Sequence, residues 1–254
     1  MGDAGSAGGS PDARRLEELS LNSSAPPGQL LYDGWLLRLA PGKAKRARSV
    51  NAVYASSRPL DEKVAYCERI YARARLPALF RLTPFSQPAS LDAELANRGY
   101  ARFDATAVEC APIPAGTQGS AQVMNLAAWI DVVGTLRASP LEHRAAHLAR
   151  LEGMPLAMRA VAIEHEGEVA ATGLAIVEDD CAGLFDIVTR DTARRRGHAR
   201  NVVASLLGAA RELGARHAYL QVQSDNEPAR RLYRQFGFEE RYVYWYRGRL
   251  GEGQ

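Results

Sequence analysis

The sequence predicts an α/β fold in which a mixed central sheet is flanked by helices and preceded by a smaller α/β lobe. Strand-like and helix-like segments alternate from about residue 29 onward, as in a layered α/β domain. A stretch rich in proline, glycine and serine, residues 113–120, separates two such series and marks a domain boundary. The order of elements before this boundary recurs after it. We therefore divide the chain into a mobile leader (1–28), an N-terminal lobe (29–112), the linker and a C-terminal lobe (121–250).

Composition narrows the class of protein. The 254 residues are 46% hydrophobic and 24% charged, which is ordinary for a globular protein with a substantial core. No apolar run approaches the ~18 residues that a membrane span requires, so we expect no membrane partner. The first residues lack a basic start followed by an apolar stretch, so we expect no secretory signal and a cytoplasmic location. The net charge of +3 is small for a nucleic-acid-binding protein, and we do not expect that partner.

The three cysteines point to no metal and no disulfide. They are widely spaced and form no Cys-x-x-Cys pair, which argues against a zinc site. We expect Cys67, Cys110 and Cys181 to be reduced core thiols.

In the first part of the chain, glycine, serine, alanine and proline dominate residues 1–28, with one or two helical turns expected at Ala13–Leu19. Pro41-Gly42 is expected to form a turn between the first two strands of the N-terminal lobe. Alternation of apolar residues and turn signals predict the following strands and helices there: strands Leu30–Leu39, Ser49–Ala55, Ala78–Thr83 and Ala101–Cys110, and helices Asp61–Arg73 and Leu91–Asn97.

In the C-terminal lobe the longest amphipathic pattern is Asn201–Leu213, which Gly214 ends. Pro228 is expected at the first position of a short helix that Gly237 ends. The other expected elements are strands Ala121–Leu126, Ala157–Glu164, Glu168–Glu178, Gly183–Thr189, His217–Gln223 and Glu240–Tyr246, helices Ala127–Arg137 and Leu141–Leu151, and a loop at Asp191–Arg200.

The two lobes are expected to be repeats of one pattern. Gly99-Tyr100 in the N-terminal lobe aligns with Gly237-Phe238 in the C-terminal lobe at an offset of 138 residues. The same offset aligns five elements without gaps. Two unrelated α/β units of similar spacing remain the alternative.

The segment that carries chemistry is Arg194 to Ala199, between a strand and a long helix. The first turn of a helix presents unpaired backbone N–H groups and the positive end of the helix dipole. Gly197 lets the backbone approach a ligand closely, and Ala199 avoids a side-chain clash. Together they indicate a pyrophosphate-binding loop. The loop is neither a Walker loop nor a dinucleotide fingerprint, because the residues that define those motifs are absent.

The stretch IVTRDTARRRGHA resembles the signature of the GNAT superfamily of N-acetyltransferases, whose phosphate loop reads Gln/Arg-x-x-Gly-x-Gly/Ala. A second stretch, QVQSDNEPARRLYRQFGF, is similar to the family's Asn-x-x-Ala-x-x-Leu-Tyr-x-x-x-Gly-Phe. The resemblance covers about residues 120–248 and implies a GNAT-type sheet, acetyl-CoA as cosubstrate and no metal. It implies transfer of an acetyl group from acetyl-CoA to a primary amine. A non-catalytic acyl-CoA sensor is the alternative.

The resemblance also implies a role for each residue. Main-chain groups of Ile187, Val188 and Thr189 would pair with the pantetheine arm, and Asn226 would bind it. Tyr233 would protonate the departing CoA thiolate, which suits a phenol of pKa near 10. The alternative for Tyr233 is a core tyrosine whose hydroxyl bonds a backbone carbonyl. The pyrophosphate would be held by the loop residues Arg194, Arg195, Arg196, Gly197, His198, Ala199 and Arg200.

Asp186 is the candidate general base, because it lies on the strand before the loop. Strand alternation, however, places it on the face opposite Ile187 and Thr189. In the N-terminal lobe the offset brings Ser56 to Asp61 to the place of the loop and Leu95 to the place of Tyr233. We therefore expect that lobe to bind no cofactor and to shape the acceptor side of the site. The acceptor amine, small molecule or peptide, is unidentified, and a homodimer is left open.

Overall fold

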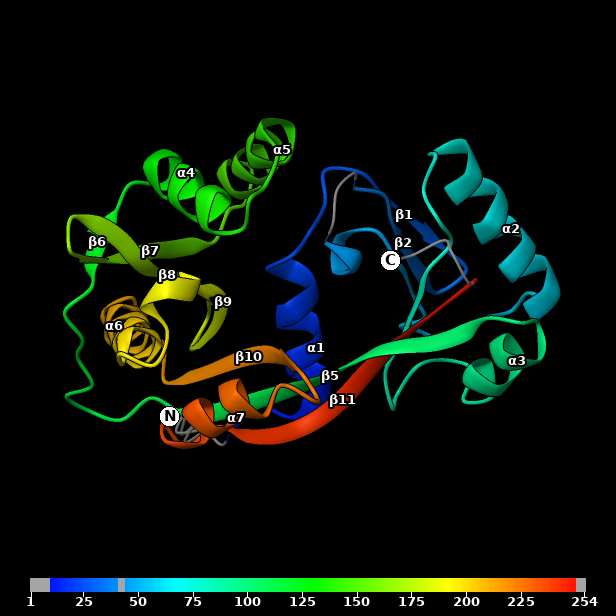
Figure 1. Ribbon diagram of the computed structural model, residues 1–254. Helices are drawn as coiled ribbons and strands as arrows, with labels where there is room; N and C mark the ends of the chain where they lie inside the picture. The colour runs from blue at the N-terminus through cyan, green and yellow to red at the C-terminus, as the bar shows by residue number, and fades with distance from the viewer. Residues whose placement is uncertain (1–9, 41–43, 250–254) are drawn as a thin grey trace, which may run out of the picture.

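The structure is a computed structural model that describes residues 10–40 and 44–249 (Figure 1). The described helices are α1 Ala13–Asn22, α2 Leu60–Arg73, α3 Leu91–Asn97, α4 Leu126–Leu136, α5 Leu141–Glu152, α6 His198–Glu212 and α7 Glu227–Arg234, with 3-10 turns η1 Lys45–Ala47 and η2 Asp191–Ala193. The strands are β1 Gln29–Tyr32, β2 Trp35–Arg38, β3 Val50–Asn51, β4 Phe80–Leu82, β5 Ala101–Pro112, β6 Gln122–Met124, β7 Ala157–His165, β8 Glu168–Glu178, β9 Cys181–Thr189, β10 His217–Gln223 and β11 Glu239–Gly248.

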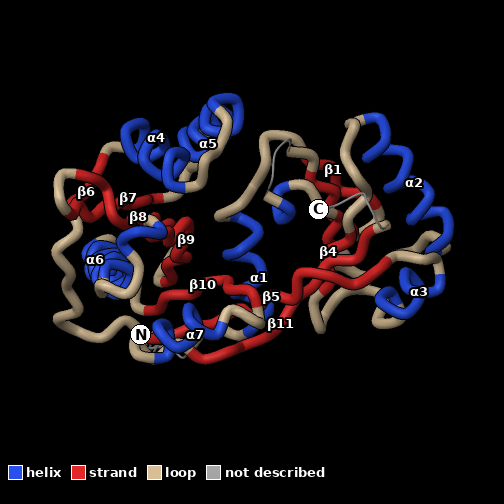
Figure 2. Tube along the Cα trace, viewed as in Figure 1, coloured by secondary structure: helices blue, strands red, loops and turns tan. Residues whose placement is uncertain are grey.

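All described strands belong to one mixed sheet, which runs through both lobes (Figure 2). The strand order is β1-β2-β3-β4-β11-β5-β10-β9-β8-β7-β6. The order from β1 to β7 is symmetric about its centre if β1 to β5 are matched in sequence with β7 to β11. The pair β3 and β4 is parallel, and so is the pair β9 and β10 at the matching place in the order. The predicted mixed sheet flanked by helices is confirmed.

The lobes exchange their last strands at the centre of this sheet. β5 closes the N-terminal lobe in sequence, yet from Thr106 to Pro112 it pairs with β10 of the other lobe. β11 closes the C-terminal lobe, yet Trp245 to Arg247 pair with β4. β5 and β11 also pair with each other along most of their length. The backbone hydrogen bonds of each lobe are therefore completed by the other.

Helices cover both faces of the C-terminal half of the sheet. α6 buries the apolar side predicted for it, including Val202, Val203 and Leu206, in one cluster with Tyr233 and Phe238 of the α7 region. α4 and α5 pack on the opposite face, where their apolar residues meet those of β7 and β8. In the other half, α2 and α3 pack on a separate cluster formed with β2, β3 and β4.

The expectation of a mobile leader over residues 1–28 is wrong for the part that the structure describes. Residues 13–22 form the helix α1, which begins where the Asp12 carboxylate accepts a hydrogen bond of 2.8 Å from the Arg15 N–H. Leu16 and Leu19 are almost completely buried against aromatic residues of β10 and β11. α1 lies across the middle of the sheet (Figure 1). Composition suggested disorder, but two leucines three residues apart are enough to bury one side of a short helix.

Two smaller differences concern the N-terminal lobe. The strand expected at Leu30–Leu39 is a hairpin, β1 and β2, with its turn at Asp33-Gly34. The strand expected at Ser49–Ala55 is reduced to Val50–Asn51. The turn expected at Pro41-Gly42 lies outside the described residues. All three cysteines are buried and free, as expected for core thiols. No helix within the described residues has the length and apolar character to cross a bilayer.

Candidate functional site

The site begins where β9 and β10 separate. The two strands pair in parallel only from Cys181 to Leu184 and from His217 to Leu220. Beyond this point β9 stays with β8, while β10 stays with β5. The edge of β9 from Ile187 to Thr189 consequently has no strand partner on the side of β10 within the described chain. An extended ligand can pair with such an edge in the way that an added strand does.

The loop after this edge carries unpaired amides. Arg195 and Gly197 both adopt left-handed backbone conformations, at φ 63° and 81°. The first bond of α6 runs from the Asn201 N–H to the Gly197 carbonyl, at 3.1 Å. Over the described part of the chain, the N–H groups of residues 195–200 have no acceptor. A Cβ at Gly197 would meet nothing within 4 Å, so the surface over the loop is open. Open amides at a helix N-terminus suit a phosphate.

Three arginine side chains near the loop contact an acidic or aromatic neighbour. Arg194 pairs with Asp191 at 2.7 Å, and Arg196 contacts the ring of His165 at 2.8 Å. The guanidinium of Arg200 lies 5.8 Å from the centre of the Phe236 ring. These positive groups border the open amides, and positive charge near a helix N-terminus adds to its attraction for anions.

Tyr233 lies on α7 and belongs to the apolar cluster that α6 forms with the sheet. It is buried, with its ring centre 6.0 Å from that of Phe238. Within the described residues its hydroxyl makes no hydrogen bond, in contrast to the alternative of a core tyrosine bonded to a carbonyl. Burial, assisted by the negative charge of Glu109, raises the pKa of Tyr233 to about 12. The phenol therefore keeps its proton at neutral pH and is a weaker acid here than a phenol with the usual pKa near 10.

Asn226 caps α7. Its side-chain oxygen accepts a hydrogen bond of 3.3 Å from the Ala229 N–H, which satisfies one orphan amide of the helix start. The side-chain NH₂ group is left to bind something else, since the structure gives it no partner among the described residues. This is compatible with the predicted contact to a cofactor arm.

Asp186 lies at a bulge in β9. Its φ of 50° is left-handed, and the register between β8 and β9 shifts at this position. The bulge places Asp186 on the α4–α5 face, where Arg137 binds one carboxylate oxygen at 2.8 Å. The ring of His147 lies 3.6 Å from the other oxygen. As alternation predicted, Asp186 and Ile187 face opposite sides, because Ile187 packs against α6.

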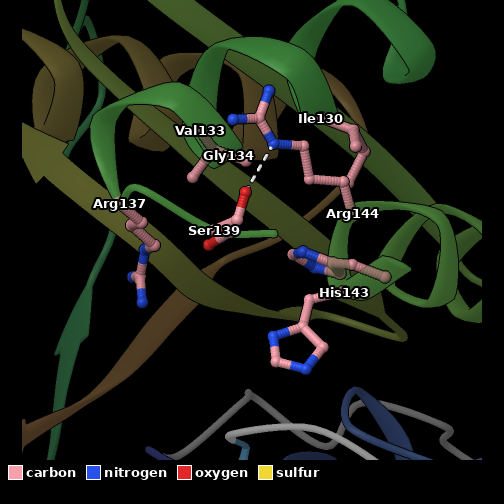
Figure 3. Close-up of a pocket in the computed structure, with 8 residues that line it drawn as sticks. Ile130, Val133, Gly134, Arg137, Ser139, His143 and Arg144 are labelled. Atoms are coloured by element: carbon pink, nitrogen blue, oxygen red, sulfur yellow. Dashed lines mark hydrogen bonds between the residues drawn. The ribbon is translucent and has the colours of Figure 1, made fainter. Parts of the chain in front are cut away.

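Residues of α4 and α5 line a pocket, among them Val133, Arg137 and His143 (Figure 3), and His147 is also part of its lining. Arg144 packs over Gly134 and donates a hydrogen bond to the Ser139 carbonyl at 3.0 Å. Burial lowers the pKa of His147, with Arg150 and Arg137 acting in the same direction and Asp186 opposing them. Neutral His147 thus adds no charge beside Asp186 at neutral pH.

Sequence reasoning missed the groups that surround Asp186. His147, Arg137 and Arg150 had no motif, and Arg46 was noticeable only as part of a basic cluster. They approach Asp186 and Phe185 through tertiary packing. The four-residue spacing of His143 and His147 was the one signal that could have placed two imidazoles on one side of α5. Within the described residues no group of three or more potential ligands is arranged for a metal ion.

Comparisons with known proteins agree with this geometry. The family described as "Acetyltransferase (GNAT) family" matches residues 147–238, which include the loop and α7. The chain is 28% identical over 246 residues to the uncharacterized N-acetyltransferase YobR of Bacillus subtilis, covering 93% of this chain and 98% of that protein. It is 39% identical over 59 residues to the uncharacterized N-acetyltransferase YycN of the same organism, covering 23% of this chain and 38% of that protein.

Solved structures share the fold over both lobes. A GCN5-related N-acetyltransferase from Kribbella flavida has a TM-score of 0.67 at 17% identity and covers 96% of this chain and 97% of its own. A tandem GNAT protein from the clavulanic acid biosynthesis pathway has a TM-score of 0.56 at 18% identity, over 93% of this chain and 89% of its own. The similarity of fold therefore extends beyond the region that the family match covers.

Proposed function

Because residues 147–238 match the GNAT family of acetyltransferases and the chain is similar over most of its length to an N-acetyltransferase, we propose that it transfers an acetyl group directly from acetyl-CoA to a primary amine. The observation that carries the proposal is the row of unpaired amides at residues 195–200, next to the unpaired edge of β9. The two features suit the two parts of CoA. The amides would bind its pyrophosphate, with the side chains of Arg194, Arg195, Arg196, His198 and Arg200 around it.

The pantetheine arm would then run along Ile187, Val188 and Thr189 as an added strand. This direction leads from the loop back toward Asp186 and Phe185, where β9 and β10 part. The thioester would be placed at this point, with the NH₂ group of Asn226 available to bind the arm. Fixing both reactants in one geometry is expected to supply much of the rate gain.

The proposed chemistry has one bond-forming and one bond-breaking event. The neutral amine attacks the thioester carbonyl, the new C–N bond forms, and the C–S bond breaks with the electron pair left on sulfur. Tyr233 donates its proton to that thiolate, and Asp186 accepts the proton that the amine loses. The unbonded hydroxyl of Tyr233 and the position of Asp186, two residues beyond the paired part of β9, support these assignments.

We also propose that residues 29–112 are a degenerate copy of the lobe at 121–250, joined by the linker 113–120 and lacking a cofactor site. The symmetric strand order supports this. So do the element bounds, because β5 begins at Ala101 and β11 at Glu239, which keeps the offset of 138 residues.

A direct test is to incubate the protein with acetyl-CoA and a panel of primary amines and to measure the release of free thiol. We expect amine-dependent release with at least one member. Acetyl-CoA binding without thiol release for any amine would contradict the enzyme and favour an acyl-CoA sensor. Absence of acetyl-CoA binding would contradict both.

A further inference from the structure

The acceptor side of the separated strands is lined by positive charge. Phe185 and Gln221 are the first residues beyond the paired parts of β9 and β10. The guanidinium of Arg46, from the N-terminal lobe, lies 5.5 Å from the centre of the Phe185 ring. It also donates a hydrogen bond to the Gln221 side-chain oxygen. A cation of one lobe therefore stands at the point where the other lobe would present the thioester.

Arg150 brings a second cation to this place from α5. Its guanidinium donates to the Ser23 carbonyl at 3.2 Å, which links α5 to the end of α1. Burial lowers the pKa of Arg150, and repulsion from Arg46 contributes, while attraction to Asp186 opposes the change. The side chains of Arg46, Arg150 and Asp186 thus share one electrostatic environment.

A third cation, Arg38, lies just behind them. Its side chain is 1% exposed, and it donates to the Leu21 carbonyl at 2.7 Å, to the Ser24 hydroxyl and to the Arg46 carbonyl. The Nε of Arg38 is buried without a partner. Burial and the positive charges of Arg81 and Arg46 lower the pKa of Arg38 to about 9.

The local charges do not balance. Arg81 is paired with Glu17, and Arg137 is paired with Asp186. Over residues 10–40 and 44–249, the three remaining guanidinium groups have only neutral partners. These groups belong to Arg38, Arg46 and Arg150. The carbonyl end of α1 supplies roughly half of one negative charge, which three cations exceed. Clustered, partly buried cations are costly unless an anion joins them.

From this imbalance we infer that the acceptor is an amine that also carries an anionic group, with Arg46 and Arg150 binding that group. The inference rests on the proposed function, because it places the acceptor next to the thioester. Guanidinium groups bind carboxylate and phosphate alike through paired hydrogen bonds, so the shared chemistry is a small anion attached to an amine. A polyamine, which carries only positive charge, would be repelled.

Matched pairs of amines provide the test. Beta-alanine is compared with beta-alaninamide, and O-phosphoethanolamine with ethanolamine, while spermidine serves as a cationic amine. With acetyl-CoA at saturation, we expect kcat/KM to be at least ~10-fold higher for an anionic member than for its neutral partner. The pair with the larger ratio distinguishes carboxylate from phosphate.

Variants then assign the effect to the arginines. Arg46→Gln and Arg150→Gln should each raise KM for the anionic amine by ~10- to 100-fold and leave KM for acetyl-CoA unchanged. Arg46→Lys should keep part of the preference, because it keeps the charge. Arg159→Gln, an exposed position on β7, is the control and should change nothing. Melting temperatures check that each variant folds.

Binding is measured separately from turnover. Glutarate, but not glutaramide, should raise the melting temperature of the parent, and Arg150→Gln should abolish the shift. A preference for neutral or cationic amines, or anion effects that persist in both glutamine variants, would overturn the inference and leave the acetyltransferase standing. If no amine causes thiol release, but glutarate still raises the melting temperature in a way that depends on Arg150, the proposed function alone would be contradicted.

Discussion

The helix starts of α6 and α2, which the offset of 138 residues aligns, differ in what their backbone amides bind. In the C-terminal lobe, α6 begins at a loop whose amides are unpaired over residues 195–200. In the N-terminal lobe, the corresponding amides of Ser57 and Arg58 donate to the carboxylate of Asp33 at 3.1 and 3.0 Å. Pro59, at the cap of α2, has no N–H to offer. One helix start therefore has its amides bound by a carboxylate of the same chain, and the other has amides without an acceptor among the described residues.

The fixed anion of the N-terminal lobe is held strongly. Backbone hydrogen bonds from Arg58 and Ser57 lower the pKa of Asp33, and Lys63 lies 3.2 Å from its Oδ2. The offset of 138 residues aligns Tyr233 with Leu95, which is fully buried. A shared framework is thus compatible with opposite uses, since a few side chains decide whether a helix start stabilises the fold or is left to a ligand.

The largest expected effect is the loss of turnover when Tyr233 is changed to phenylalanine, compared with the same change in the N-terminal lobe. If Tyr233 protonates the thiolate, Tyr233→Phe should lower kcat by ~10²–10⁴-fold and leave acetyl-CoA affinity almost unchanged. Tyr100→Phe is the matched control in the other lobe, where the hydroxyl donates to Glu68 at 2.6 Å. Tyr100→Phe should lower the free energy of unfolding by at most ~3 kcal/mol and leave kcat unchanged. A fall of less than ~3-fold for Tyr233→Phe would argue against its role as the acid.

A charge placed on the open loop should remove cofactor binding. Gly197→Glu puts a carboxylate where phosphate is expected, so acetyl-CoA affinity should fall by ~100-fold or more in calorimetry. Gly99→Glu is the control, because Gly99 has the same left-handed φ and equally open surroundings. The control should bind acetyl-CoA normally. Unchanged affinity in Gly197→Glu would mean that the pyrophosphate binds elsewhere.

Much of this site could be predicted from the sequence because its signals are local. The period of α6, the stop at Gly214 and the loop residues lie within one short segment. The remaining features depend on distant parts of the chain. The exchange of β5 and β11 joins residues more than a hundred positions apart. The bulge at Asp186 needs a left-handed backbone at a residue that is not glycine, and composition does not indicate it.

The positive surface at the acceptor side was hidden for the same reason. Arg46 and Arg150 come from different lobes and approach each other only because α1 links α5 to the segment around Arg38. The segment of α1 was expected to form one or two helical turns within a mobile leader, because its neighbours are small and polar. The buried leucines of α1 are too few for a local hydrophobic pattern to predict a packed helix against the small and polar composition of the segment.

The smallest expected effect concerns Asp33. Its folded-state pKa is lowered, so its contribution to stability is present above the ordinary carboxyl pKa of ~3.9 and is lost as pH falls below that value. Asp33→Asn should therefore be less stable than the parent at neutral pH, and the difference should shrink in acid. Urea unfolding at neutral pH and at a pH below ~3.9 measures the free energy of unfolding of parent and variant. Asp225→Asn, at an exposed aspartate, is the control. A difference that does not depend on pH would contradict the fixed-anion role.

The contrast between the lobes is tested most directly by amide-resolved hydrogen exchange with and without acetyl-CoA. The account predicts that acetyl-CoA slows exchange at residues 195–200, while Ser57 and Arg58 are already slow in the free protein and do not change. Unaltered exchange at residues 195–200, or a new slowing at Ser57 and Arg58, would contradict the claim that only the C-terminal lobe binds the cofactor.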